Sequence, residues 1–274
     1  LTAQGIRFSS KSDSEILLRL YQQQGLEQTL PMLRGEFAFA LFDRREDCLY
    51  LVRDRFGVKP QYWAMTPDGL VFGSELKVLF AHPEVERRFT SDGLFHQLMQ
   101  TMVPGTTAFA GVHQVKPGHV LKVQRTAGRL EVSEWAYWDV NFPRQADRDR
   151  SLDEAHHIAS VRSALLEAVE LRMVADVPVG CYLSGGIDSC SILGLASAVS
   201  QSPVKAFTIG FDDARYDESP IAEQMAQATG AQQDVMRLSG QELYGHMEQT
   251  LWHTERTIYN TLAVAKFLMS RHVN

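Results

Sequence analysis

Val177 to Ser189 reads VPVGCYLSGGIDS, and this stretch decides the fold of the second half of the chain. An apolar run leads into Gly185 and Gly186, and a helix-compatible run over residues 192–199 leads away, so the glycines mark a strand-to-helix turn. Glycine lets the backbone approach a ligand closely, and the free N–H groups of a helix start attract an anion. The stretch therefore predicts a phosphate-binding turn.

The neighbours of the glycines strengthen that interpretation. Ser184 and Ser189 supply hydroxyl donors, and Asp188 supplies a carboxylate that can hold Mg²⁺ against phosphates. The alternative is a glycine-rich turn that binds nothing. A Walker A loop is excluded because the Lys-Ser/Thr ending is absent. Residues 184–189 instead resemble the pyrophosphate-binding loop of the ATP pyrophosphatase family, whose members split ATP into AMP and pyrophosphate while adenylating an oxygen of the substrate.

The segments around this loop alternate between strand and helix patterns. A strand is predicted over residues 204–211 and a helix over 221–229, with Gly230 as its C-cap. Residues 216–219 between them fit either the border of a substrate site or a solvated loop. We predict an α/β doubly wound parallel sheet that binds its ligand at the carboxyl ends of the strands.

A long helix precedes the loop. Residues 151–154 form a capping-box pattern that opens it. Apolar residues then recur at helical spacing, which predicts one buried stripe made of Ile158, Val161, Leu165, Ala168 and Leu171.

The first half of the chain has a different pattern. Another capping box, Ser12 to Glu15, opens a helix. Two hairpins follow, one from strands at 35–43 and 48–54, the other from 61–65 and 69–74. With further helical and β segments to residue 138, this predicts an α+β domain over residues 1–140 and a second domain over 141–274.

Composition narrows the function classes. The chain has 274 residues, 45% of them hydrophobic, and a net charge of −6, so it lacks the basic excess of a general nucleic-acid binder. No apolar run approaches membrane-spanning length, which favours a cytoplasmic protein. Cys48, Cys181 and Cys190 show no metal-binding spacing and fit small core residues better than nucleophiles.

The order of several motifs resembles glutamine-dependent asparagine synthetase. The similar segments are 12–15 (SDSE), 34–43 (RGEFAFALFD), 53–60 (RDRFGVKP), 73–77 (GSELK) and 177–189. The resemblance runs through nearly the whole chain. It implies an N-terminal-nucleophile glutaminase domain of stacked antiparallel sheets, joined to an ATP-pyrophosphatase domain.

The resemblance also implies an activity and its residues. The activity is amidation of aspartate through an aspartyl-AMP intermediate, with glutamine and ATP as substrates and Mg²⁺ as the metal ion. Assembly into a homodimer is left as an open question. Asp13 matches the glutamine-binding acid, although an acid at a helix start also fits an interaction with the helix dipole. ATP-binding positions match Leu183, Ser184, Gly185, Gly186, Asp188, Ser189 and Ile209, with Asp188 as the metal ligand. Ile209 fits a plain core position almost equally well.

Two departures limit what the chain is expected to do. The sequence starts at Leu1, and the early segment that carries the family's nucleophilic cysteine has no counterpart in it, so no catalytic residue is assigned. The phosphate loop that the family places beyond residue 274 has no counterpart either, so we expect a fragment that is inactive alone. Two other functions stay open: a β-lactam-forming or other amide-tailoring synthetase of the same architecture, and a non-catalytic nucleotide-binding module.

Overall fold

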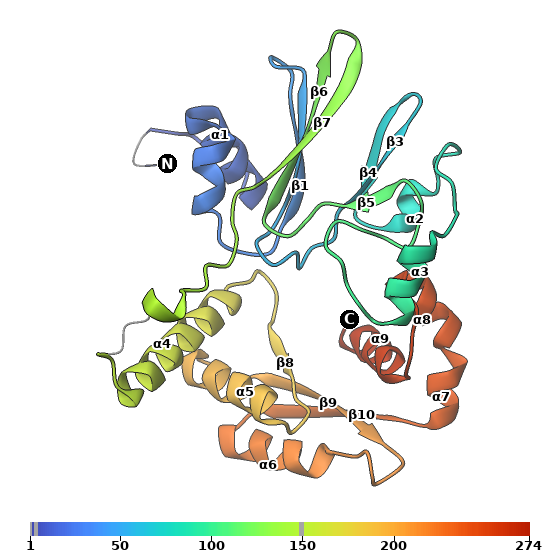
Figure 1. The fold of residues 1–274 in the computed structure, drawn as a ribbon. Coiled ribbons are helices and arrows are strands. Elements are labelled where there is room, and N and C mark those ends of the chain that lie inside the picture. Colours follow the sequence, from blue (N-terminus) through green and yellow to red (C-terminus); the bar gives the residue numbers. More distant parts are fainter. Residues whose placement is uncertain (1, 3–4, 148–150) are drawn as a thin grey trace. The chain divides into compact units, whose positions relative to one another are not determined.

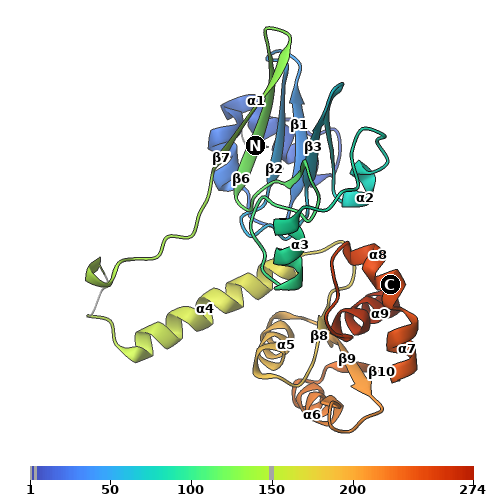
Figure 2. The same ribbon diagram turned by 45° about the vertical axis from the view of Figure 1, so that its right-hand side comes forward.

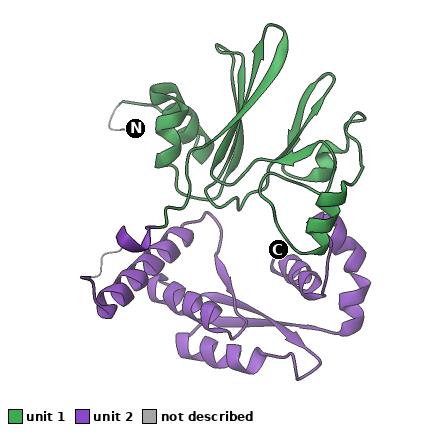
Figure 3. Ribbon diagram, in the orientation of Figure 1, with its two compact units in different colours: residues 1–142 green, residues 143–274 purple. Residues whose placement is uncertain are grey.

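The chain folds into two compact units, residues 1–142 and 143–274 (Figure 3). The computed structural model describes residues 2, 5–147 and 151–274 (Figure 1). The prediction that concerns Leu1 lies outside the described residues.

Unit 1 contains two antiparallel sheets. The first has the order β1-β2-β6-β7, built from Ala38–Asp43, Cys48–Arg53, His119–Thr126 and Arg129–Ala136. The second has the order β4-β3-β5, built from Gly69–Gly73, Tyr62–Thr66 and Val112–Gln114. Both predicted hairpins are confirmed, since β1 pairs with β2 and β3 pairs with β4 in antiparallel register.

The two sheets pack face to face with helices outside them. Leu51 and Leu121 of the first sheet share a core cluster with Trp63 and Leu70 of the second. Helix α1 (Asp13–Thr29), with the short 3-10 helix Leu30–Met32, covers the other face of the first sheet, and α2 (Leu76–Leu79) covers that of the second. Helix α3 (Ser91–Leu98) follows α2 in the chain. The stacked antiparallel architecture is confirmed.

Helix α1 begins differently from the predicted capping box. Ser12 is the N-cap, as predicted, and its hydroxyl accepts a bond from the Ser14 N–H at 3.3 Å. The Glu15 carboxylate reaches past Ser12 and accepts the backbone N–H groups of Ser9 and Ser10 at 2.9 and 2.7 Å. The box is therefore replaced by an anchor for the segment before the helix.

Unit 2 is built on a parallel sheet of order β10-β9-β8, made of Gln232–Leu238, Lys205–Phe211 and Gly180–Tyr182. Helices α5 (Ile187–Val199) and α6 (Ser219–Thr229) pack on one face through a cluster around Leu193. Helices α7 (Gly240–Gly245) and α9 (Leu262–Val273) pack on the other face, with α8 (Met247–Thr254) between them in the chain (Figure 2). The doubly wound fold class is confirmed, and Gly230 is the left-handed C-cap of α6 as predicted.

Helix α4 (Glu154–Arg172), preceded by a 3-10 turn at Gln145–Asp147, corrects two predictions. Its N-cap is Asp153, which accepts the His156 N–H at 2.8 Å, and not Ser151. The predicted stripe is exposed, with Ile158 at 61% and Val161 at 59%. The helix packs on α5 through a neighbouring face that includes Val169 and Met173.

Within the described part of the chain, no helix combines the length and the apolar character needed to cross a bilayer.

Candidate functional site

The predicted phosphate loop begins where β8 meets β9. The two strands run parallel with Tyr182 opposite Phe207, and the Leu183 N–H donates to the Phe207 carbonyl at 2.8 Å. Leu183 is 2% exposed. This bond holds the first residue of the loop against the sheet, so the following residues emerge at the carboxyl end of β8.

Gly185 has a backbone that demands glycine. Its φ is +82°, and an added Cβ would lie 3.1 Å from the Ile221 Cβ and 3.3 Å from the Glu218 carbonyl oxygen. The loop therefore packs closely on the start of α6. Gly186, the N-cap of α5, has an ordinary φ of −71°.

The two serines of the loop bond to each other. Their hydroxyl oxygens lie 3.1 Å apart, and the Ser189 hydroxyl also donates to the Gly186 carbonyl at 3.0 Å. The Ser184 N–H donates to the Ser189 oxygen at 3.2 Å, and the Gly186 N–H to the Ser184 oxygen at 3.4 Å. These contacts close the loop over the first turn of α5, where hydroxyl rotors can turn toward an anion.

Asp188 projects from the first turn of α5 and is exposed. Among the residues that the structure describes, no group of three or more His, Cys, Asp or Glu side chains could hold a metal ion. A lone carboxylate still fits Mg²⁺ at a nucleotide, because this ion commonly takes one or two carboxylates and completes its shell with phosphate oxygens and water.

Ile209 lies on β9 two residues beyond Phe207. Extending the parallel register of Tyr182 and Phe207 by two residues brings Ile209 opposite Ser184. Its side chain packs into the cluster of Leu238, Val264 and Leu268 on the α9 face. Ile209 is thus a core residue, and a contact of its backbone with adenine stays a prediction.

Asp13 belongs to unit 1, whereas the residues above belong to unit 2. It is the first residue of α1 and is exposed, and the Ser14 hydroxyl donates to its carboxylate at 3.4 Å. Its carboxylate is open to a cationic ligand such as an α-ammonium group. The structure thus groups the six loop positions with Ile209 in unit 2 and leaves Asp13 by itself.

The charged residues at the end of β2 have structural partners. The Arg53 guanidinium donates to the carbonyls of Lys59, Val115 and Gly57 at 2.9, 2.8 and 2.6 Å. The Asp54 carboxylate accepts the N–H groups of three residues in the same loop, namely Phe56, Val58 and Lys59. Both side chains are buried, and their hydrogen bonds to the backbone hold the loop 54–59 in shape.

The cysteines do not resemble activated nucleophiles. Cys48 is 0% and Cys181 8% exposed, and burial raises the pKa of both thiols. Cys190 is half-buried on α5. The interpretation of the two buried cysteines as small core residues is confirmed.

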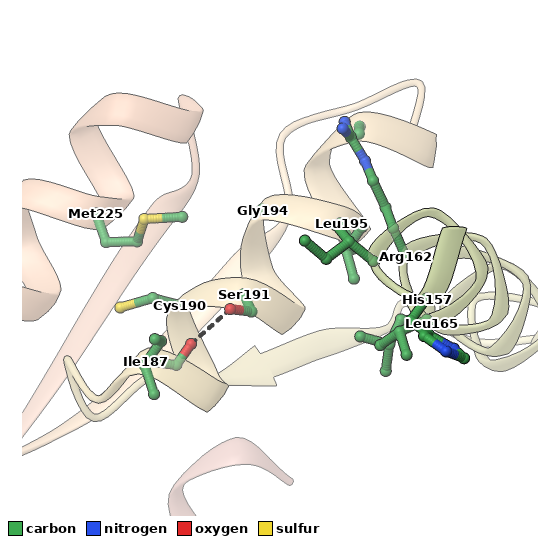
Figure 4. Close-up of a pocket in the computed structure, with 12 residues that line it drawn as sticks. His157, Arg162, Leu165, Ile187, Cys190, Ser191, Gly194, Leu195 and Met225 are labelled. Atoms are coloured by element: carbon green, nitrogen blue, oxygen red, sulfur yellow. Dashed lines mark hydrogen bonds between the residues drawn. The ribbon is translucent and has the colours of Figure 1, made fainter. Parts of the chain in front are cut away.

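Sequence reasoning did not predict a groove beside α5. It has a volume of about 820 Å³ and is lined mainly by apolar side chains of α4 and α5, including Ile158, Val161, Leu165 and Ile187 (Figure 4). Met225 of α6 also lines it, as does Ser191, whose hydroxyl donates to the Ile187 carbonyl at 2.7 Å. Its apolar walls distinguish it from the polar phosphate loop at the start of the same helix.

Comparison with known families covers both units. Residues 1–138 match the family described as glutamine amidotransferase domain, and residues 160–274 match the family described as asparagine synthase. The chain belongs to the glutamine amidotransferase and asparagine synthase family.

Relatives within this family carry different names. "Asparagine synthetase [glutamine-hydrolyzing] 3" of Bacillus subtilis is 32% identical over 267 residues, which cover 92% of this chain and 42% of that protein. "Amidase chyE" of Penicillium rubens is 35% identical over 270 residues, covering 92% of this chain and 38% of that protein. The chain thus spans about two fifths of the length of these curated relatives.

Proposed function

We propose that this chain carries a glutamine-binding and an ATP-binding part of a glutamine-dependent asparagine synthetase. The observation that carries the proposal is the loop Ser184–Ser189, where a positive-φ glycine, two hydroxyls and a helix start converge at the carboxyl end of a parallel strand. That arrangement suits the pyrophosphate end of ATP.

Each predicted residue takes a role that its surroundings support. Ser184 and Ser189 donate to phosphate oxygens, Gly185 and Gly186 let the backbone approach them, and Asp188 holds Mg²⁺, which shields the separating charge of pyrophosphate. Leu183 and the backbone of Ile209 border the nucleotide. Adenylation of the aspartate side chain makes its carboxylate oxygen part of a good leaving group, AMP, which ammonia then displaces.

Asp13 pairs with the α-ammonium group of glutamine in unit 1. No catalytic residue is assigned within the chain. The proposed activity therefore concerns the protein expressed from its complete gene, and we expect the chain by itself to be inactive.

A second candidate differs only in the acceptor. Relatives named amidases, such as "Amidase chyE", are as similar to this chain as the asparagine synthetases are. An enzyme that amidates an acid other than aspartate would use the same loop, because adenylation makes the same demands on pyrophosphate binding.

The deciding experiment is ATP–pyrophosphate exchange by the complete protein. We expect exchange that requires aspartate and falls at least about a hundredfold in Asp188→Ala. Exchange that requires another carboxylic acid would support the second candidate. Absence of exchange with every acid tested would reject both and favour a non-catalytic nucleotide-binding module.

A further inference from the structure

Residues 212–218, which we call the β9–α6 loop, touch the phosphate loop directly. The Glu218 carbonyl oxygen lies 3.3 Å from where a Cβ of Gly185 would stand, and the Ile221 side chain lies 3.1 Å from it. Because Gly185 has no room to shift toward α6, the backbone at Glu218 sets one limit on where the phosphate loop lies.

One carboxylate holds this end of the β9–α6 loop. Asp217 Oδ1 accepts the N–H of Ser219, the first residue of α6, at 3.1 Å. Asp217 Oδ2 lies 3.4 Å from Arg237 Nη1. The hydrogen bonds from Ser219 and the nearby Arg237 lower the pKa of Asp217, so the carboxylate is charged at neutral pH.

Arg237 connects this carboxylate to the middle strand. It lies at the carboxyl end of β10, opposite Gly210 of β9. Its Cγ lies 3.3 Å from where a Cβ of Gly210 would stand, so its stem covers the backbone next to Ile209. The contacts thus run from the phosphate loop through Glu218 and Asp217 to Arg237, and on to the strand proposed to meet adenine.

We propose that Asp217 and Arg237 are positioning residues for the nucleotide, which fix the distance between the loop that binds its pyrophosphate and the β9 backbone that meets its base. The inference rests on the proposed function of the Ser184–Ser189 loop. Neither side chain is assigned a contact with ATP.

The guanidinium end of the pair is open to solvent, which limits what the pair contributes to the stability of the fold. The Arg237 side chain is 61% exposed and that of Asp217 15%. Ion pairs of this kind contribute only about 0.2–1 kcal/mol in water. Their removal should therefore change nucleotide binding far more than the unfolding temperature.

The test uses variants of the complete protein in which either Asp217 or Arg237 is replaced, so that the ion pair is lost. Asp217→Asn keeps an acceptor for the Ser219 N–H but loses the charge, and Arg237→Met keeps the stem over Gly210 but loses the guanidinium. Each should raise the KM for ATP in pyrophosphate exchange about three- to fivefold with kcat within about twofold, because both variants remove the interaction that positions the bound nucleotide. Arg237→Lys should recover most of the loss. The double variant should be no worse than either single variant, since both remove one interaction.

Arg215→Met is the matched control. Arg215 lies in the same loop and pairs with Asp213 at 2.6 Å, and among the described residues it is not one of those nearest to Gly185 or Gly210. The Arg215→Met variant removes the same charge as Arg237→Met but leaves the Asp217–Arg237 pair in place. Its KM for ATP should therefore stay at the wild-type value. A second readout is the dissociation constant of a fluorescent ATP analogue, which does not depend on turnover.

The outcomes separate this inference from the proposed function. A wild-type protein that neither exchanges pyrophosphate nor binds the analogue would reject the proposed function. Normal binding and exchange in Asp217→Asn and Arg237→Met would overturn the positioning role and leave the proposed function standing. A parallel loss of kcat, unfolding temperature and binding in both variants would also overturn it, since that pattern indicates a purely structural pair.

Discussion

At the scale of single residues, the two adjacent glycines of the phosphate loop make different demands. Gly185→Ala requires φ near +82° and a Cβ about 3.1 Å from that of Ile221. Strain of this kind costs about 1–3 kcal/mol and moves the loop off α6. We expect the variant to lose ATP–pyrophosphate exchange at least about tenfold, measured on the complete protein.

Gly186→Ala provides the control for that substitution. Its φ is −71°, and the nearest atom to an added Cβ is the Ser184 hydroxyl oxygen at 3.4 Å. The variant adds no backbone strain, so it should lose less exchange activity than Gly185→Ala. Equal loss in both variants would contradict the assignment of strain to Gly185 alone.

Local residue patterns explain why this loop was predictable and its supports were not. A strand, two glycines and a helix start are neighbours in sequence, and residues 184–189 fold as their order indicates. The bond between the Ser184 and Ser189 hydroxyls depends on rotamers that no spacing rule specifies. The Asp217–Arg237 pair joins residues 20 positions apart through β10, a strand that the sequence analysis did not predict.

At the scale of elements, the stability of the segment that precedes α1 should depend on pH, because the Glu15 carboxylate holds it. Hydrogen bonds from Ser9 and Ser10 lower the pKa of this carboxyl from 4.5 to about 2. Since the folded-state pKa lies below the unfolded value, the stabilisation is present above pH 4.5 and is lost as the pH falls toward 2. An NMR titration of the Glu15 carboxyl should show a midpoint near 2, with loss of amide protection at Ser9 and Ser10 over the same range.

Glu15→Gln is the variant that checks this titration. It keeps the shape of the side chain but replaces the carboxylate by a neutral amide. The protection factors of the Ser9 and Ser10 amides should then be lower than in the wild type at neutral pH. They should not fall further between pH 4.5 and 2. A Glu15 midpoint near 4.5 in the wild type would refute the anchor described for this helix start.

Helix α4 shows the limit of apolar periodicity as a guide to burial. Periodicity predicts the face on which apolar residues gather, whereas burial also needs a partner on that face. The Ile158–Leu165 part of the predicted stripe lines the open groove, and the packing contact with α5 uses Val169. We expect Val169→Ala to lower the free energy of unfolding by about 2 kcal/mol, because Val169 is only 6% exposed and packs in the cluster around Leu193.

Val161→Ala makes the same chemical change on the same helix at a position that is 59% exposed. It should change the free energy of unfolding by less than about 0.5 kcal/mol in urea denaturation. A similar loss in both variants would show that the Val161 face is covered in solution.

At the scale of the whole molecule, the two units have separate cores. Leu51 belongs to a cluster made only of unit 1 residues, and Leu193 to one made only of unit 2 residues, and each is 0% exposed. Leu→Ala at such a site costs about 2–5 kcal/mol. Since local stability follows the cooperative unit that contains the residue, each variant should lose amide protection chiefly in its own unit.

Hydrogen exchange measured by mass spectrometry distinguishes this from a single cooperative core. Leu51→Ala should speed exchange in β2 and β6 while peptides from β8 and β9 keep their wild-type rates, and Leu193→Ala should do the reverse. Faster exchange across both units in either variant would mean that their unfolding is coupled. Faster exchange confined to the mutated unit would fit the proposal that glutamine and the nucleotide bind to different units. Each proposed site would then keep its geometry when the core of the other unit is weakened.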